Sequence, residues 1–286
     1  MDGPHAEPRP APGGRRVARR ATPPRRVKTF EVKRIKAGVA SPASEDLIVE
    51  KTVSLIVNGE KLLSFQCLPE MLEELAVGFL ITEGLASAAK EILSVTLNPK
   101  ADELVANLQV GAGRLKEFRE ALISGSSCGK ALSSGQPLDP LDCRRKIDLS
   151  FRVAQDVLLA AMGEFRARAA RPGRPKSVHA AAIVSGTAIV AFAEDVGRHN
   201  AVDKVVGSCS LQRVPLHDKI LLTTGRMSPE IAAKALRAGI PVVASMRGPT
   251  AAAVELAGGA SITLAGFVAT TTMTLYSAEW RITSKS

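Results

Sequence analysis

The run from Ala188 to Gly207 constrains the fold of this chain more than any other segment. Its apolar start, residues 188–192, has the composition of a buried strand, and two carboxylates and Gly197 follow it. Beyond Asn200 the apolar residues recur three and four positions apart, which is the spacing of one helix face. The segment therefore predicts a strand, a turn and a helix. In α/β proteins the edge where strands end and helices begin usually binds ligands.

The polar side chains at this junction allow two interpretations. In the first they line a ligand site, which the convergence of so many polar groups in so few residues favours. In the second Asp203 and Lys204 are solvated, and Glu194 pairs with Arg198. The polar residues concerned are Glu194, Asp195, Arg198, His199, Asn200, Asp203 and Lys204.

From residue 141 onward, segments typical of strands alternate with segments typical of helices. Ser228 before Pro229 predicts a helix start, and Gly239 predicts its end. Such alternation predicts an α/β fold, with a central sheet covered by helices on both faces. The expected strands are 178–184, 188–192, 219–223, 241–245 and 262–267, and the expected helices are 153–169, the segment after His199, 228–239 and 250–256.

Residues 45–140 have the pattern of a smaller α+β domain, which precedes the α/β domain of residues 141–286. Asn58-Gly59 lies between two apolar runs, a strong hairpin signal. Gly, Ser and Pro make residues 133–142 typical of a linker. The other expected elements are a helix over 69–80, strands over 94–97 and 103–110, and a short helix ending before Ser124.

The positive charge of the chain is concentrated at its N-terminus. Of the formal +10, residues 1–36 carry +8, from eleven Lys or Arg against three acidic residues, and the rest carries only +2. This segment is rich in Pro and Arg and lacks apolar periodicity, so we expect residues 1–44 to be a disordered basic tail. A basic tail can bind nucleic acid, but the near-neutral body and an aromatic content of 3% argue against a nucleic-acid binder.

The sequence predicts no membrane association. No apolar segment follows the N-terminal arginines as it would in a secretory signal. Glu255 interrupts the best candidate for a membrane span near the C-terminus. We therefore expect a cytoplasmic protein without a membrane partner.

The four cysteines lie far apart and lack the spacing of a metal site or a redox pair. Cys67 and Cys209 end apolar segments and are expected to be small buried residues. Cys128 differs because it lies in a run of Ser and Gly, with Lys130 two residues away. An accessible sulfur beside a cation favours the thiolate, which is the nucleophile. The residues alone leave open whether Cys128 is reactive.

Two turns have the composition of phosphate sites. Gly225-Arg226-Met227-Ser228 and Met246-Arg247-Gly248-Pro249-Thr250 each lead into an expected helix. A helix N-terminus with an adjacent arginine can hold an anion, although each turn alone is also explained by ordinary helix capping. Two such turns at the edge that carries Arg198 favour a phosphate-bearing ligand.

Together these segments resemble the formate dehydrogenase accessory sulfurtransferase family, FdhD. The resemblance covers most of residues 45–280, and the run 194–207 is its longest and most specific part. The other matching segments are Leu75-Ala76-Val77-Gly78-Phe79-Leu80, Glu83-Gly84, Ser126-Ser127-Cys128-Gly129, Val178-His179-Ala180-Ala181-Ala182, Gly225-Arg226 with Ser228 and Glu230, and Pro249-Thr250 with Ala253-Val254-Glu255.

The resemblance implies a sulfur carrier with Cys128 as its catalytic residue. Members receive persulfide sulfur from a cysteine desulfurase and pass it to the molybdenum of bis-molybdopterin guanine dinucleotide, the cargo cofactor of formate dehydrogenase. The implied fold is a cytidine-deaminase-like three-layer domain beside the smaller domain, and the implied assembly is a homodimer. The implied cofactor-binding residues are Phe267, Val268, Ala269, Thr270, Thr271, Thr272, Arg226, Arg247 and His199.

Deaminase activity and an intrinsic metal are not expected. The zinc deaminases need His-x-Glu and Pro-Cys-x-x-Cys motifs. Here His179 precedes Ala180-Ala181, His199 precedes Asn200-Ala201, and Pro241 precedes Val242-Val243. No set of residues has the spacing of a zinc site.

Three segments depart from the family pattern. Ala131 stands where many members have a second loop cysteine, and Pro175-Lys176-Ser177-Val178 replaces the usual Thr-Gly-Gly-x before His179. The stretch 267–272 carries no charge, although the corresponding family segment contains basic residues. These departures leave a second hypothesis open, a divergent relative that binds the cofactor or its client as a chaperone without transferring sulfur. A nucleic-acid binder that depends on the tail is the third.

Overall fold

The structure is a computed structural model that describes residues 27–123, 147–170 and 177–284. Cys128, Ala131 and Cys143 lie outside these residues, as do the predicted linker and residues 1–26. Within the described ranges, no helix is both long and apolar enough to cross a membrane.

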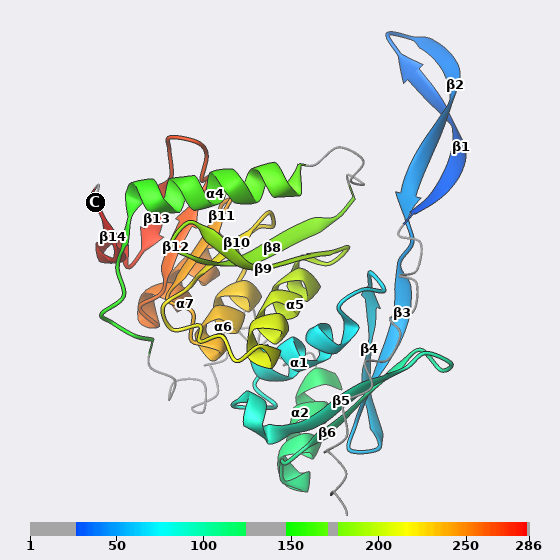
Figure 1. Ribbon diagram of the computed structural model, residues 1–286, viewed down its shortest axis with the longest axis vertical. Coiled ribbons are helices and arrows are strands. Elements are labelled where there is room, and N and C mark those ends of the chain that lie inside the picture. The colour runs from blue at the N-terminus through cyan, green and yellow to red at the C-terminus, as the bar shows by residue number, and fades with distance from the viewer. Residues whose placement is uncertain (1–26, 124–146, 171–176, 285–286) are drawn as a thin grey trace, which may run out of the picture.

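A six-stranded mixed sheet forms the centre of the larger unit (Figure 1). Helix α4 lies on one face, and α5, α6 and α7 lie on the other, which confirms the predicted sheet with helices on both faces. The strands in spatial order are β13 (Thr274–Ser277), β12 (Thr263–Gly266), β11 (Val242–Ser245), β10 (Ile220–Thr223), β8 (His179–Ser185) and β9 (Ala188–Asp195). The helices are α4 (Gln155–Ala169), α5 (Arg198–Leu211), α6 (Pro229–Ala238) and α7 (Ala251–Gly259).

The two faces of this sheet enter different cores because successive side chains of a strand point in opposite directions. Along β8, Ala180 and Ala182 pack in the cluster that contains Phe165 of α4. Ala181 and Ile183 belong to the other cluster, which includes the buried residues of α5. The continuous apolar run of β8 is thus explained by burial on both sides.

Strand direction brings several segments to one edge of the sheet. β10, β11 and β12 are parallel to one another, and β8 is antiparallel to both β10 and β9. The carboxyl ends of β9, β10, β11 and β12 therefore meet at the same edge. The first turns of α5, α6 and α7 follow β9, β10 and β11 there. We call this the carboxyl edge.

The smaller unit is a four-stranded sheet with two helices. The Asn58-Gly59 turn joins β3 and β4 as predicted, with φ of 49° and 85°. Its strands in spatial order are β4 (Glu60–Cys67), β3 (Lys51–Val57), β6 (Glu103–Leu108) and β5 (Ile92–Asn98), and its helices are α1 (Leu72–Thr82) and α2 (Ala112–Ile123). The remaining short elements are η1 (Ala89–Glu91), β7 (Val153–Ala154), η3 (Glu279–Arg281) and β14 (Ile282–Thr283).

The two units share one hydrophobic core, because α1 packs directly on α5. A Cβ atom on Gly78 of α1 would lie 1.8 Å from the backbone oxygen of Asp203. A Cβ atom on Gly207 of α5 would lie 1.9 Å from the backbone oxygen of Glu74. Each glycine thus allows the backbone of the other helix to touch its own.

Residues 27–48 form a β-hairpin that extends away from the body, and we call it the arm (Figure 1). Its strands β1 (Val27–Lys36) and β2 (Val39–Ile48) make a two-stranded sheet of their own. The prediction of disorder is therefore wrong for residues 27–44.

Polar interactions explain why hydrophobic periodicity missed the arm. Thr29 donates to Asp46 at 2.6 Å, and Ser44 donates to Glu31 at 2.8 Å. Such cross-strand pairs support a hairpin without an apolar face. Ala37 and Gly38, with φ of 50° and 82°, supply the two left-handed residues of a tight hairpin turn.

Replacing Gly207 by Ala should destabilise the protein strongly, because the new methyl group would overlap a backbone atom of α1. We expect the free energy of unfolding to fall by on the order of 2–3 kcal/mol in urea titrations followed by circular dichroism. Gly163→Ala on the exposed face of α4 is the matched control, because nothing lies within 4 Å of its Cβ position. The control should be neutral or slightly stabilising. Equal effects of the two substitutions would contradict the close backbone contact.

Candidate functional site

The polar residues of the 194–207 run join the two units. Asp195 and Lys204 form an ion pair at 2.6 Å, and both side chains are fully buried. The carboxylate of Asp195 accepts from the Leu68 amide at 3.1 Å, and the Lys204 ammonium donates to the Leu68 carbonyl at 3.1 Å. The Asn200 side chain donates both to Asp195 at 2.9 Å and to the Gln66 carbonyl at 2.8 Å. These residues therefore fasten the end of β4 to α5.

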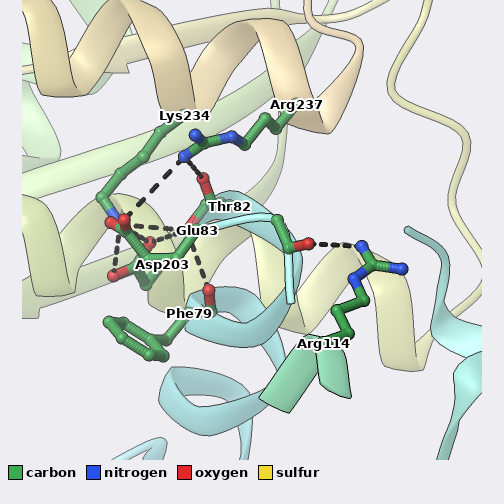
Figure 2. A network of polar contacts seen from close by, with 8 residues as sticks. Phe79, Thr82, Glu83, Arg114, Asp203, Lys234 and Arg237 are labelled. Atoms are coloured by element: carbon green, nitrogen blue, oxygen red, sulfur yellow. Dashed lines mark hydrogen bonds and ion pairs between the residues drawn. The ribbon is translucent and has the colours of Figure 1, made fainter. Parts of the chain in front are cut away.

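A second buried network connects α1, α5 and α6 (Figure 2). The Lys234 ammonium lies 2.8 Å and 3.0 Å from the two Asp203 oxygens, and 2.7 Å from Glu83. Thr82 donates to Asp203 at 2.6 Å, and Arg237 donates to the Thr82 carbonyl at 2.9 Å. The network therefore holds the C-terminal end of α1 against both helices.

The charges of this second network balance. Burial raises the pKa of Asp203 to about 6, although the Lys234 ammonium beside it acts in the opposite direction. Burial also opposes ionisation of Glu83, but Lys234 and Arg237 outweigh it and lower its pKa. The two carboxylates raise the pKa of Lys234 in spite of burial. At neutral pH two cations therefore face two carboxylates.

The burial and hydrogen bonds of Asp203 and Lys204 contradict both interpretations of these two residues. The solvated interpretation is wrong, because Asp203 is 1% and Lys204 0% exposed. Their hydrogen bonds run to α1, α6 and the end of β4, so they position helices rather than face a ligand. No place in a buried network was predicted from the sequence for Thr82, Glu83, Lys234 and Arg237. The sequence signal for this network was the presence of Lys234 and Arg237 among the alanines of α6.

The first turn of α5 places Arg198 and His199 at the carboxyl edge. The Arg198 stem packs over Gly225, where a Cβ atom would lie 2.9 Å from the Arg198 Cβ. Burial, Arg198 and Lys234 together lower the pKa of His199 to about 4, so its ring is neutral at pH 7. His199 Nε2 is buried and has no hydrogen-bond partner among the described residues. His199 therefore brings no positive charge to the carboxyl edge.

The loops after β10, β11 and β12 form one hydrogen-bonded layer at this edge. Ser245 connects two of them, because its hydroxyl donates to the Gly225 carbonyl at 2.6 Å and accepts from the Arg247 amide at 3.0 Å. The Val268 amide donates to the Ser245 carbonyl at 3.0 Å and so attaches the third loop. The Thr250 amide, at the start of α7, donates to the Met227 carbonyl at 3.0 Å.

The predicted cofactor residues lie on these loops, except His199, which lies in α5. Arg226 and Arg247 are exposed just before α6 and α7. Phe267 is 56% exposed, and its ring lies against Gly248, where a Cβ atom would be 2.7 Å away. Thr270, Thr271 and Thr272 are exposed, and Ala269 is partly buried. Val268 is only 2% exposed and packs into the core on the α4 side, so its side chain does not face solvent.

The two described cysteines are buried. Burial raises the pKa of Cys67 to about 12 and the pKa of Cys209 to about 11. Neither thiol therefore forms a thiolate near neutral pH. The residues that the structure describes contain no group of three or more His, Cys, Asp or Glu able to hold a metal ion.

The pattern of residues that produces this geometry is shared with known proteins. The model of the FdhD/NarQ family matches residues 48–283. The chain belongs to this family. A sulfur carrier protein FdhD from Bacillus pumilus is 31% identical and covers 84% of this chain and 91% of its own. The sulfur carrier protein FdhD of Burkholderia cenocepacia is 34% identical, with 85% and 91% covered.

A solved structure shares the fold. The formate dehydrogenase accessory protein from Desulfotalea psychrophila superposes with a TM-score of 0.70 at 22% identity, covering 90% of this chain and 99% of that one. The predicted family is thus confirmed, together with a mixed α/β fold that this solved structure shares.

Lys234→Met should be among the most destabilising single substitutions, because it removes the shared cation and leaves Asp203 and Glu83 buried. We expect a loss of about 3–5 kcal/mol in the free energy of unfolding, measured by urea denaturation at pH 7. Lys116→Met is the matched control, because Lys116 pairs with Glu120 on the surface of α2 at 4.0 Å. The control should cost less than about 1 kcal/mol. Comparable losses would mean that the network contributes no more than a surface pair.

Proposed function

We propose that this protein carries sulfur as a persulfide on Cys128 for the maturation of a formate dehydrogenase. The observation that carries the proposal is membership of the FdhD/NarQ family, whose compared relatives are named sulfur carrier proteins. The proposed donor is a cysteine desulfurase, and the proposed recipient is the molybdenum of bis-molybdopterin guanine dinucleotide. Free thiols persist in the cytoplasm, where we place the reaction.

The cysteines of the chain are not equivalent candidates for this role. Cys67 and Cys209 are buried with raised pKa values and cannot reach a partner protein. Cys128 follows Ser124-Gly125-Ser126-Ser127 and precedes Gly129-Lys130. Small neighbours leave a sulfur accessible, and the nearby lysine favours the thiolate.

The proposed loading step is a thiol–disulfide type exchange. The Cys128 thiolate attacks the outer sulfur of the desulfurase persulfide. The new sulfur–sulfur bond forms on Cys128 while the old one breaks, and the desulfurase cysteine leaves as a thiolate. In delivery the bond on Cys128 breaks, the outer sulfur bonds to molybdenum, and an electron pair from the reduced metal restores the Cys128 thiolate.

The carboxyl edge is the proposed platform for the cargo cofactor. Arg226 and Arg247 are exposed at two helix N-termini, which suits the phosphates of a guanine dinucleotide. The exposed ring of Phe267 and the hydroxyls of 270–272 offer stacking and hydrogen bonds on the same layer of loops. The proposal includes formate dehydrogenase as client and a homodimer as the working assembly.

Two departures from the family pattern support a second candidate function. Ala131 removes the cysteine that could relay sulfur from Cys128, and residues 267–272 supply no charge to the cofactor. A protein with these changes could bind the cofactor or its client as a chaperone without carrying sulfur. Sulfur loading and cofactor binding therefore need separate tests.

The first test is sulfur loading in the full chain. We expect the protein, incubated with a cysteine desulfurase and cysteine, to gain one sulfur atom in its intact mass. Cys128→Ser should abolish this gain, whereas Cys143→Ser should retain it. A wild-type protein that gains no sulfur would contradict the carrier role and favour the chaperone hypothesis.

The second test is nucleotide binding at the carboxyl edge, with guanosine diphosphate as the probe. Arg226→Ala and Arg247→Ala should each weaken binding about 10- to 100-fold in calorimetry, because each removes a charged hydrogen bond worth ~1.5–3 kcal/mol. Lys100→Ala, in the exposed turn between β5 and β6, removes the same charge and should leave the affinity unchanged. If the variant with both Arg226→Ala and Arg247→Ala bound guanosine diphosphate as tightly as the wild type, the carboxyl edge would not be the cofactor platform.

A further inference from the structure

The arm exposes apolar side chains on an element that is too small to be stable alone. None of its strand residues is buried, and Phe30 and Leu47 are 43% and 41% exposed. Ile35 and Val39, beside its turn, are each 70% exposed. A lone two-stranded hairpin is at best marginally stable in water, so contacts with a partner would stabilise the arm. The arm therefore has the properties of an interface element.

The two edges of the arm differ in their ability to pair with another strand. Its two-residue turn makes Lys36 and Val39 a hydrogen-bonded pair, and such pairs then alternate along an antiparallel ladder. The amides of β1 that point outward are therefore those at the odd positions from Thr29 to Ile35. On β2 the outward position opposite Lys33 is Pro42, which has no amide proton. The edge of β1 is the open one.

We propose that β1 pairs with β1 of a second copy of this chain, antiparallel, about a two-fold axis at Val32. The two arms would then form a four-stranded sheet in the order β2-β1-β1-β2. This inference deepens the homodimer of the proposed function by naming its surface. The arm carries four basic and three acidic residues, so two copies do not repel each other strongly.

Charge complementarity selects the register. Hydrogen bonding across the new edge requires odd positions to face odd positions. An axis at Glu31 or at Lys33 would place like charges directly opposite each other. An axis at Val32 instead places Glu31 opposite the partner's Lys33, twice by symmetry, and Phe30 opposite the partner's Arg34. The remaining like pair, Lys28 with the partner's Lys36, lies at the ends of the strand, where solvent screens it.

The first experiment is cross-linking in the full chain with Cys128 and Cys143 replaced by Ser. At the axis the two Val32 positions form a non-hydrogen-bonded pair with Cα atoms about 4.5 Å apart, within disulfide range. Val32→Cys should thus become a covalent dimer under oxidised glutathione. Ala43→Cys is the control, because Ala43 is the cross-strand neighbour of Val32 on β2. The two Ala43 positions would be about 14 Å apart, three strand spacings, and should not cross-link.

The second experiment is a charge exchange followed by sedimentation equilibrium at low salt. Glu31→Lys or Lys33→Glu alone should raise the dimer dissociation constant about tenfold, because each creates two like-charge contacts. The double variant should return it toward the wild-type value.

Proline substitutions test the open edge directly. Glu31 and Ser44 are cross-strand partners joined by one hydrogen bond, so either substitution loses that bond. Glu31→Pro also removes an outward amide of β1 and should give monomers, whereas Ser44→Pro on β2 should leave the dimer.

Several results would overturn this assignment. One is a wild-type protein that is monomeric, and another is equal cross-linking of the two cysteine variants. A third is a variant without the arm that still dimerises but no longer binds another protein. Sulfur loading is measured independently of the oligomeric state. A failure of the arm is therefore distinguishable from a failure of the carrier function.

Discussion

The close contact between α1 and α5 determines the arrangement of everything else in the described molecule. Gly78 and Gly207 let the two helix backbones touch, and the polar groups beside them are buried. Enclosed charges are tolerated only when they are paired, which Asp203 with Lys234 and Asp195 with Lys204 achieve. The close packing that the glycines allow is therefore compatible with these charges only because each charge is paired.

The same helix performs two tasks along its length. Its first turn carries Arg198 and His199 at the carboxyl edge, while the following turns carry Asp203 and Gly207 toward α1 and Lys204 toward the end of β4. The position of the smaller unit relative to the carboxyl edge is thus set by one rigid element. The polar residues of 194–207, which resemble a reactive cluster in the sequence, are largely structural. The reactive chemistry is proposed for Cys128, in another segment.

Most of the fold could be predicted from the sequence because its signals are local. Asn58-Gly59, Ser228 with Pro229, and Gly239 marked element ends that the structure confirms. The arm was missed because polar cross-strand pairs stabilise it, and β13 was missed because it is only four residues long with a polar residue at each end. Arg226 and Arg247 lie at the edge that carries Arg198, as predicted from the alternation of strands and helices. The inward side chain of Val268 was not predictable, because it depends on the left-handed backbone of Phe267, with φ of 50°.

The buried network of Glu83, Asp203, Lys234 and Arg237 has an evolutionary consequence. A closed set of two cations and two carboxylates loses much stability when one member changes, but an ion pair replaced as a whole by apolar residues can be neutral. Substitutions at these positions should therefore be inherited together rather than singly, across helices far apart in the chain. Residues 83, 203 and 234 should behave as one heritable unit during divergence, while an exposed pair such as Lys116 with Glu120 is free to change one residue at a time.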